Sequence, residues 1–136
     1  MRPTRFTDFV IDLVKNQPTA SRVQTLAEAG DKQHPRGVVI TTATGEARWQ
    51  FVGQLPEGAK HDSFDDAPVT DAAPPTGEPP QSDDLPEAWF AAALTRSENA
   101  EIASVERWST REGERAGNHG LTVHFHNGAR VFARQL

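Results

Sequence analysis

An acidic, proline-rich segment in the middle of the chain limits the fold more than any other sequence feature. Residues 61–87, HDSFDDAPVTDAAPPTGEPPQSDDLPE, contain six prolines, eight acidic side chains and no lysine or arginine. Proline lacks the backbone N–H that helix and sheet interiors need, and a segment with so few large apolar residues cannot build a core. We therefore expect an N-terminal α+β lobe over residues 1–60, an extended connector over 61–84 and a C-terminal α+β lobe over 85–136.

The net charge of −5 comes from this acidic segment. Residues 1–60 carry eight basic and six acidic side chains, and residues 88–136 carry six and five. Two slightly basic lobes joined by an acidic connector form a layout in which the connector can compete for any anion that the lobes bind.

Both expected lobes are small. A unit of fewer than about 60 residues is marginally stable alone. The chain has no cysteine, which excludes disulfides, thiolate metal sites and thiol chemistry. Each lobe therefore depends on packing, on the other lobe or on a partner for its stability.

Two helices are expected near the N-terminus. The first has one apolar stripe at helical spacing, with Thr4 as its N-cap and its end before Pro18. Its stripe consists of Phe6, Phe9, Val10, Leu13 and Val14. The second covers residues 21–30, because Ser21 and Gln24 have capping-box spacing and Gly30 is a stop signal. Its inward residues would be Val23, Leu26 and Ala27.

Residues 37–51, GVVITTATGEARWQF, are typical of a β-hairpin. An even-length loop around Thr44 and Gly45 makes the apolar positions of the two strands agree. One face then carries Val38, Ile40, Thr42, Ala47, Trp49 and Phe51, and the other carries Val39, Thr41, Arg48 and Gln50.

The C-terminal lobe is expected to begin with a helix. Asp84 and Glu87 have capping-box spacing at its start. Its inward residues would be Trp89, Phe90, Ala93 and Leu94. Residues 101–110, EIASVERWST, fit helical spacing, but their β-branched content and the hairpin that follows favour a strand.

The last hairpin, LTVHFHNGARVFARQL, allows two registers. A two-residue turn at Asn127 and Gly128 would place two arginines on the apolar face. A three-residue loop with Gly128 in the left-handed bulge position separates the faces better, so we prefer it. That register groups Leu121, Val123, Phe125, Ala129, Val131 and Ala133 on the apolar face.

The segments GVVITTATG and GLTVHFHNG both have nine residues from glycine to glycine, and a strand returns after each. Either the two halves share a helix-then-hairpin plan, as after a duplication, or two unrelated hairpins look alike.

The outward face of the last hairpin is the main candidate for binding, because cations there alternate with an aromatic ring. An acidic peptide with an apolar anchor would suit it, including the chain's own connector. The candidate interaction residues are His124, Arg130, Phe132 and Arg134 on the hairpin, and Phe64, Asp65, Asp66 and Val69 on the connector. Arg107, Arg111 and Arg115 could extend the cationic face.

The sequence offers only weak candidates for a metal site. His124 and His126 share a strand face, with His119 upstream, but Arg130 would lie across from His124 and repel a cation. The acidic pairs of the connector, Asp65-Asp66 and Asp83-Asp84, have suitable oxygen ligands but little structure to hold them in place. We therefore expect no metal and no cofactor.

No phosphate-binding loop, nucleophile elbow or dinucleotide-binding turn is present in the sequence. Asp8 and Asp12 interrupt the apolar run that a signal peptide needs, so we expect a cytoplasmic protein, and no run is long enough to cross a bilayer. The favoured function is a non-catalytic adaptor or assembly component of phage or mobile-element type, with a protein partner or homo-oligomer. The alternative is a nucleic-acid-associated regulator whose acidic segment competes for the basic-aromatic face.

Overall fold

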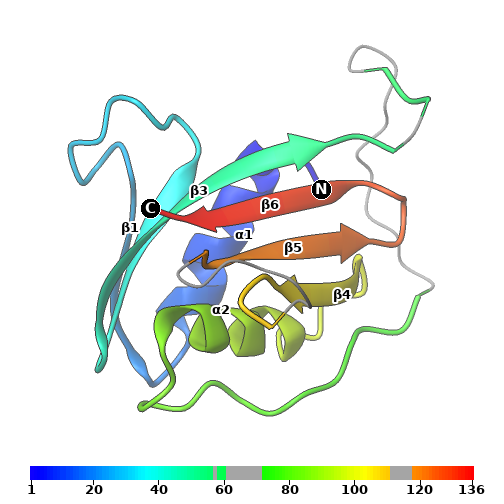
Figure 1. Ribbon diagram of the computed structural model, residues 1–136. Coiled ribbons are helices and arrows are strands. Elements are labelled where there is room, and N and C mark those ends of the chain that lie inside the picture. The colour runs from blue at the N-terminus through cyan, green and yellow to red at the C-terminus, as the bar shows by residue number, and fades with distance from the viewer. Residues whose placement is uncertain (57, 61–71, 111–117) are drawn as a thin grey trace.

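Two helices and six strands make up the residues that the structure, a computed structural model, describes: 1–56, 58–60, 72–110 and 118–136. In chain order they are α1 (Pro3–Lys15), β1 (Ala20–Thr25), β2 (Gly37–Thr42), β3 (Gly45–Gln54), α2 (Pro86–Thr95), β4 (Ile102–Arg107), β5 (Gly120–Phe125) and β6 (Arg130–Gln135). All neighbouring strands pair antiparallel, in the order β1-β2-β3-β6-β5-β4. The predicted α+β class is confirmed, and both helices lie on the same side of the sheet (Figure 1).

The two halves of the chain share this sheet, because β3 pairs with β6 at its centre. The N-terminal half contributes α1 and the strands β1 to β3, and the C-terminal half contributes α2 and the strands β4 to β6. The division into lobes over 1–60 and 85–136 with a connector over 61–84 stays a prediction, although the described residues of both lobes form one continuous sheet.

The central pairing has the register of an approximate two-fold axis between Gln50 and Arg134, which hold corresponding positions in the halves because they pair with Gly37 and Gly120. These two residues pair with each other at the centre of the sheet. The neighbouring pair Trp49–Gln135 corresponds to the pair Phe51–Ala133 on the other side of the axis. The β3–β6 contact is therefore the kind of symmetric pairing that two copies of one unit would make.

Irregular details recur at corresponding places in the two halves. The strand register shifts by one residue between Ala20 and Arg22 in β1, and between Ile102 and Ser104 in β4. The residue after each of these strands donates its N–H to a glycine carbonyl: Leu26 to Gly37 at 3.1 Å, and Trp108 to Gly120 at 3.0 Å. Because bulges and such closing contacts are specific features, their recurrence supports the shared plan that the two nine-residue segments suggested.

The core lies between the sheet and the two helices. Both predicted hairpin registers are confirmed, since Thr42 pairs with Gly45 and the Phe125 N–H bonds the Ala129 carbonyl, and the apolar faces predicted for both hairpins are buried. The predicted inward residues of α2 are also buried. Aromatic rings connect the halves: Trp49 lies 5.0 Å from Phe90, centroid to centroid. The predicted strand at 101–110 is confirmed as β4.

The predicted helix over residues 21–30 is wrong, because residues 20–25 form the edge strand β1. Val23 pairs with Ile40 across β1 and β2, and this non-local pairing outweighs the weak local helical signal. The reciprocal contact of a capping box is instead made by Thr25 and Glu28, whose side chains each accept a backbone N–H from the other residue at 3.1 Å. It closes a turn rather than starting a helix.

The predicted helix caps are also wrong. The N-cap of α1 is Arg2, not Thr4, and that of α2 is Leu85, not Asp84. In both helices a proline is the first helical residue, where its fixed φ suits the helix and its missing N–H costs nothing.

Candidate functional site

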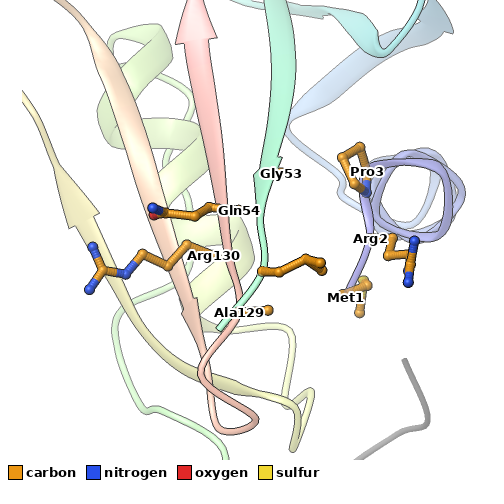
Figure 2. A pocket seen from close by; sticks show the side chains of 8 residues that line it. Met1, Arg2, Pro3, Gly53, Gln54, Ala129 and Arg130 are labelled. Carbon is orange, nitrogen blue, oxygen red and sulfur yellow. The ribbon is translucent and has the colours of Figure 1, made fainter. Parts of the chain in front are cut away.

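One face of the sheet carries no helix, and its two central strands present the strip that we take as the candidate site. Because side chains alternate along a strand, burial of Trp49 and Ala133 under the helices turns their neighbours to the other face. This central strip consists of Arg48, Gln50, Val52 and Gln54 from β3 with Arg130, Phe132, Arg134 and the following Leu136. In Figure 2 the side chains of Gln54 and Arg130 extend away from Met1 and Pro3.

The central strip exposes apolar surface. Val52 is 48% exposed and Leu136 is 47% exposed, and Leu85 is the one other large apolar residue exposed in the described parts of the chain. Val52 pairs with the half-buried Phe132, so two apolar side chains lie together on this face. Apolar contacts beside polar groups at the centre of a sheet face are typical of protein-binding surfaces.

The strip is also cationic. Arg130 and Arg134 are exposed on either side of Phe132 along β6, and His124 pairs with Arg130 on β5. The structure thus brings the four predicted hairpin residues onto one face, while their binding role stays a prediction. The predicted connector residues Phe64, Asp65, Asp66 and Val69 lie outside the described residues, as do Arg111 and Arg115.

Trp108 borders the strip, a place that its sequence neighbours do not predict. Its indole N–H donates to the Thr122 hydroxyl at 2.9 Å, on the face of the sheet that lacks helices. The ring lies over Gly120, where a β-carbon would come within 2.4 Å of it. Leu26 takes the corresponding place over Gly37. The sequence signal for this packing was the glycine at the start of β2 and of β5, which leaves room for the side chain above it.

We expect Gly120→Ala to displace the Trp108 ring, because the new β-carbon would lie 2.4 Å from its Cε3 atom and 2.8 Å from the Ala133 carbonyl oxygen. The free energy of unfolding should fall by about 1–3 kcal/mol in urea denaturation. In a Trp108→Ala chain, Gly120→Ala should lower the free energy of unfolding by less, because the indole ring that the new β-carbon would strike is absent. An equal cost in both backgrounds would contradict this packing.

A buried carboxylate on α2, that of Glu87, binds the two residues that flank Trp108 and the first residue of β5. Glu87 is 3% exposed and accepts hydrogen bonds from the Arg107 Nε at 2.9 Å, the Gly120 N–H at 3.0 Å and the Ser109 N–H at 3.2 Å. The Ser109 hydroxyl also donates to it. Burial raises the pKa of Glu87, but the hydrogen bonds from Ser109, Gly120 and Arg107 outweigh it, so the pKa lies below its ordinary value.

This cluster contains a serine, a histidine and a carboxylate, yet its geometry is not that of a nucleophilic triad. The Ser109 hydroxyl donates to Glu87 itself, and the His119 Nδ1 lies 3.6 Å from the same carboxylate. In a triad the histidine accepts the serine proton. A carboxylate with a lowered pKa is also a weak base at neutral pH. We interpret Glu87 as a structural residue that positions Trp108.

The described part of the connector packs against the helices rather than across the strip. Pro80 is buried, and its carbonyl accepts the Thr19 hydroxyl at 3.5 Å. The Gly77 carbonyl accepts Arg96 Nη1 at 3.1 Å, beyond the end of α2. Residues 72–85 therefore lie on the helical side of the molecule (Figure 1).

A small cavity of about 120 Å³ opens between the start of α1 and the ends of β3 and β6 (Figure 2). It is lined by Met1, Arg2, Pro3, Gly53, Gln54, Leu55, Ala129 and Arg130. It offers room for one apolar group of about the size of a benzene ring.

His124 pairs with Arg130, as predicted. Among the residues that the structure describes, no three His, Asp or Glu side chains are grouped so that they could hold a metal ion. Nor does this part of the chain contain a helix long and apolar enough to cross a membrane.

Comparison with protein-family models, curated proteins and solved structures finds no match to this chain.

Proposed function

We propose that the chain is a non-catalytic adaptor or assembly protein of the cytoplasm, which binds a partner protein through the central strip. The observation that carries the proposal is the exposure of Val52 beside Phe132 on a sheet face without helices, with the exposed Leu136 further along the same strip. Folded proteins cover most of their large apolar side chains, so exposed ones that gather on one surface favour an interface.

The strip has the composition of an interface centre. Aromatic and arginine side chains are enriched among the residues that dominate binding energy, and Phe132 lies between Arg130 and Arg134. Small-molecule sites are usually concave, whereas an open sheet face suits a protein surface better. The acidic connector remains a candidate second binding element.

Nucleic acid is the alternative partner, because cations on both sides of an aromatic ring can bind phosphates while the ring stacks on a base. The net charge of −5 weakens long-range attraction of a polyanion, so a protein is favoured. The steepness of the salt dependence separates the two: binding through several phosphates weakens steeply as ionic strength rises, and binding through an apolar protein interface with few ion pairs weakens much less.

The proposal can be tested by affinity capture from extract of the native source. We expect Val52→Ser to reduce the captured partner about tenfold, and Val52→Ser with Phe132→Ser to abolish capture. Leu85→Ser is the control, because it removes an even more exposed apolar side chain outside the strip and should leave capture unchanged. Thermal unfolding would confirm that all variants are folded. Equal capture by folded strip variants would refute the proposal.

A further inference from the structure

The geometry points to an acidic protein segment as the partner of the central strip, with apolar residues between its carboxylates. This inference rests on the proposed function and adds the chemistry of the partner. It follows from the order of side chains on the strip, from the surroundings of its arginines and from the lack of an acidic side chain among the residues that define it.

Side chains of two kinds alternate along one edge of the strip. On the outward face of β6 and the residue after it the order is Arg130, Phe132, Arg134, Leu136. Same-face residues on a strand are about 6–7 Å apart, so the Cα atoms of Arg130 and Arg134 are about 13 Å apart, and the Phe132 ring starts between them. An extended segment with acidic and apolar side chains alternating on one face has the same spacing.

The two arginines have no carboxylate partner among the described residues. Their cross-strand neighbours on β3 are neutral: Gln54 pairs with Arg130, and Gln50 pairs with Arg134. On the other side Arg130 pairs with His124 and Arg134 with Gly120. The described ion pairs involve other arginines. An incoming carboxylate could therefore form a charge-assisted, bidentate bond without displacing an internal partner.

A second copy of the chain docked strip to strip fits less well. The residues that define the strip include three arginines and no acidic side chain, so the strip of a second copy would offer no side-chain carboxylate to Arg130 and Arg134. Like charges across an interface disfavour association. An acidic segment instead compensates the charge of Arg130 and Arg134 while Phe132 and Val52 contact its apolar side chains.

The test places a photoreactive phenylalanine analogue at position 132 of the full chain and irradiates it in extract of the native source. Sequencing of the adducts should identify protein segments in which acidic and apolar residues take turns at every second position, so that they alternate on one face. Arg130→Gln with Arg134→Gln should lower the adduct yield about tenfold. Arg22→Gln with Arg36→Gln, two exposed arginines outside the strip, changes the net charge equally and should have no effect.

The outcomes separate the two proposals. Protein adducts that lack acidic residues, or that persist in the Arg130→Gln and Arg134→Gln chain, would overturn the acidic partner while the binding face stands. Adducts that a nuclease destroys would overturn it in favour of nucleic acid. The absence of any adduct at position 132 would overturn both.

Discussion

Replacing Trp49 with alanine will lower the free energy of unfolding by about 3–5 kcal/mol, the range for large buried aromatic side chains. Trp49 is fully buried on β3, and its ring meets Phe90 of α2 edge to face. The substitution thus removes a contact between the two halves as well as buried apolar area. Urea denaturation followed by circular dichroism would measure the change.

Val52→Ala is the control for this result, because Val52 lies on the same strand but is half exposed. It should change the free energy of unfolding by no more than about 0.5 kcal/mol. Since the halves share one sheet and one core, we also expect a single unfolding transition in both variants. A small effect of Trp49→Ala, or separate transitions for the halves, would contradict the shared core.

Glu87→Ala will lower the free energy of unfolding by about 2–4 kcal/mol at neutral pH, because the buried Gly120 N–H and the Arg107 guanidinium lose their acceptor. Glu46→Ala, which removes an exposed carboxylate 3.7 Å from Arg48, should cost less than about 1 kcal/mol. Comparable losses in the two variants would show that the Glu87 cluster is not a structural centre.

The same residue makes stability depend on pH. The pKa of Glu87 is lower in the folded chain than in the unfolded chain, so its stabilisation is full above the ordinary carboxyl range. It is lost as the pH falls through the lowered pKa, because the unfolded chain takes up the proton first. Denaturation at a series of pH values should therefore show a smaller loss of stability in acid for Glu87→Gln than for the natural chain. Parallel profiles would contradict this assignment.

Strong local patterns predicted most of the fold. Alternation and turn glycines determined both hairpins, because a shift of one residue would have exposed side chains such as Trp49 or Val123. The edge strand β1 escaped prediction because its partner β2 begins only after the connection over residues 26–36, and a short window shows only its weak helical spacing. The helix starts were misplaced because proline at the first helical position competed with polar capping residues.

The candidate site was partly predictable. The outward face of the last hairpin followed from its register, which placed Arg130, Phe132 and Arg134 together. The contribution of β3 to the same face did not follow, because the β3–β6 pairing joins residues about 80 positions apart. The buried place of Glu87 was missed for a similar reason, since its partners come from β4 and β5.

The most direct test of the central claim compares two surface positions of the full chain in its native source. A photoreactive side chain at position 52 lies on the strip, and one at position 8 lies on the exposed side of α1. We expect a discrete protein adduct from position 52 and none from position 8. Equal adducts from both positions, or none from position 52, would show that the central strip is not the binding face.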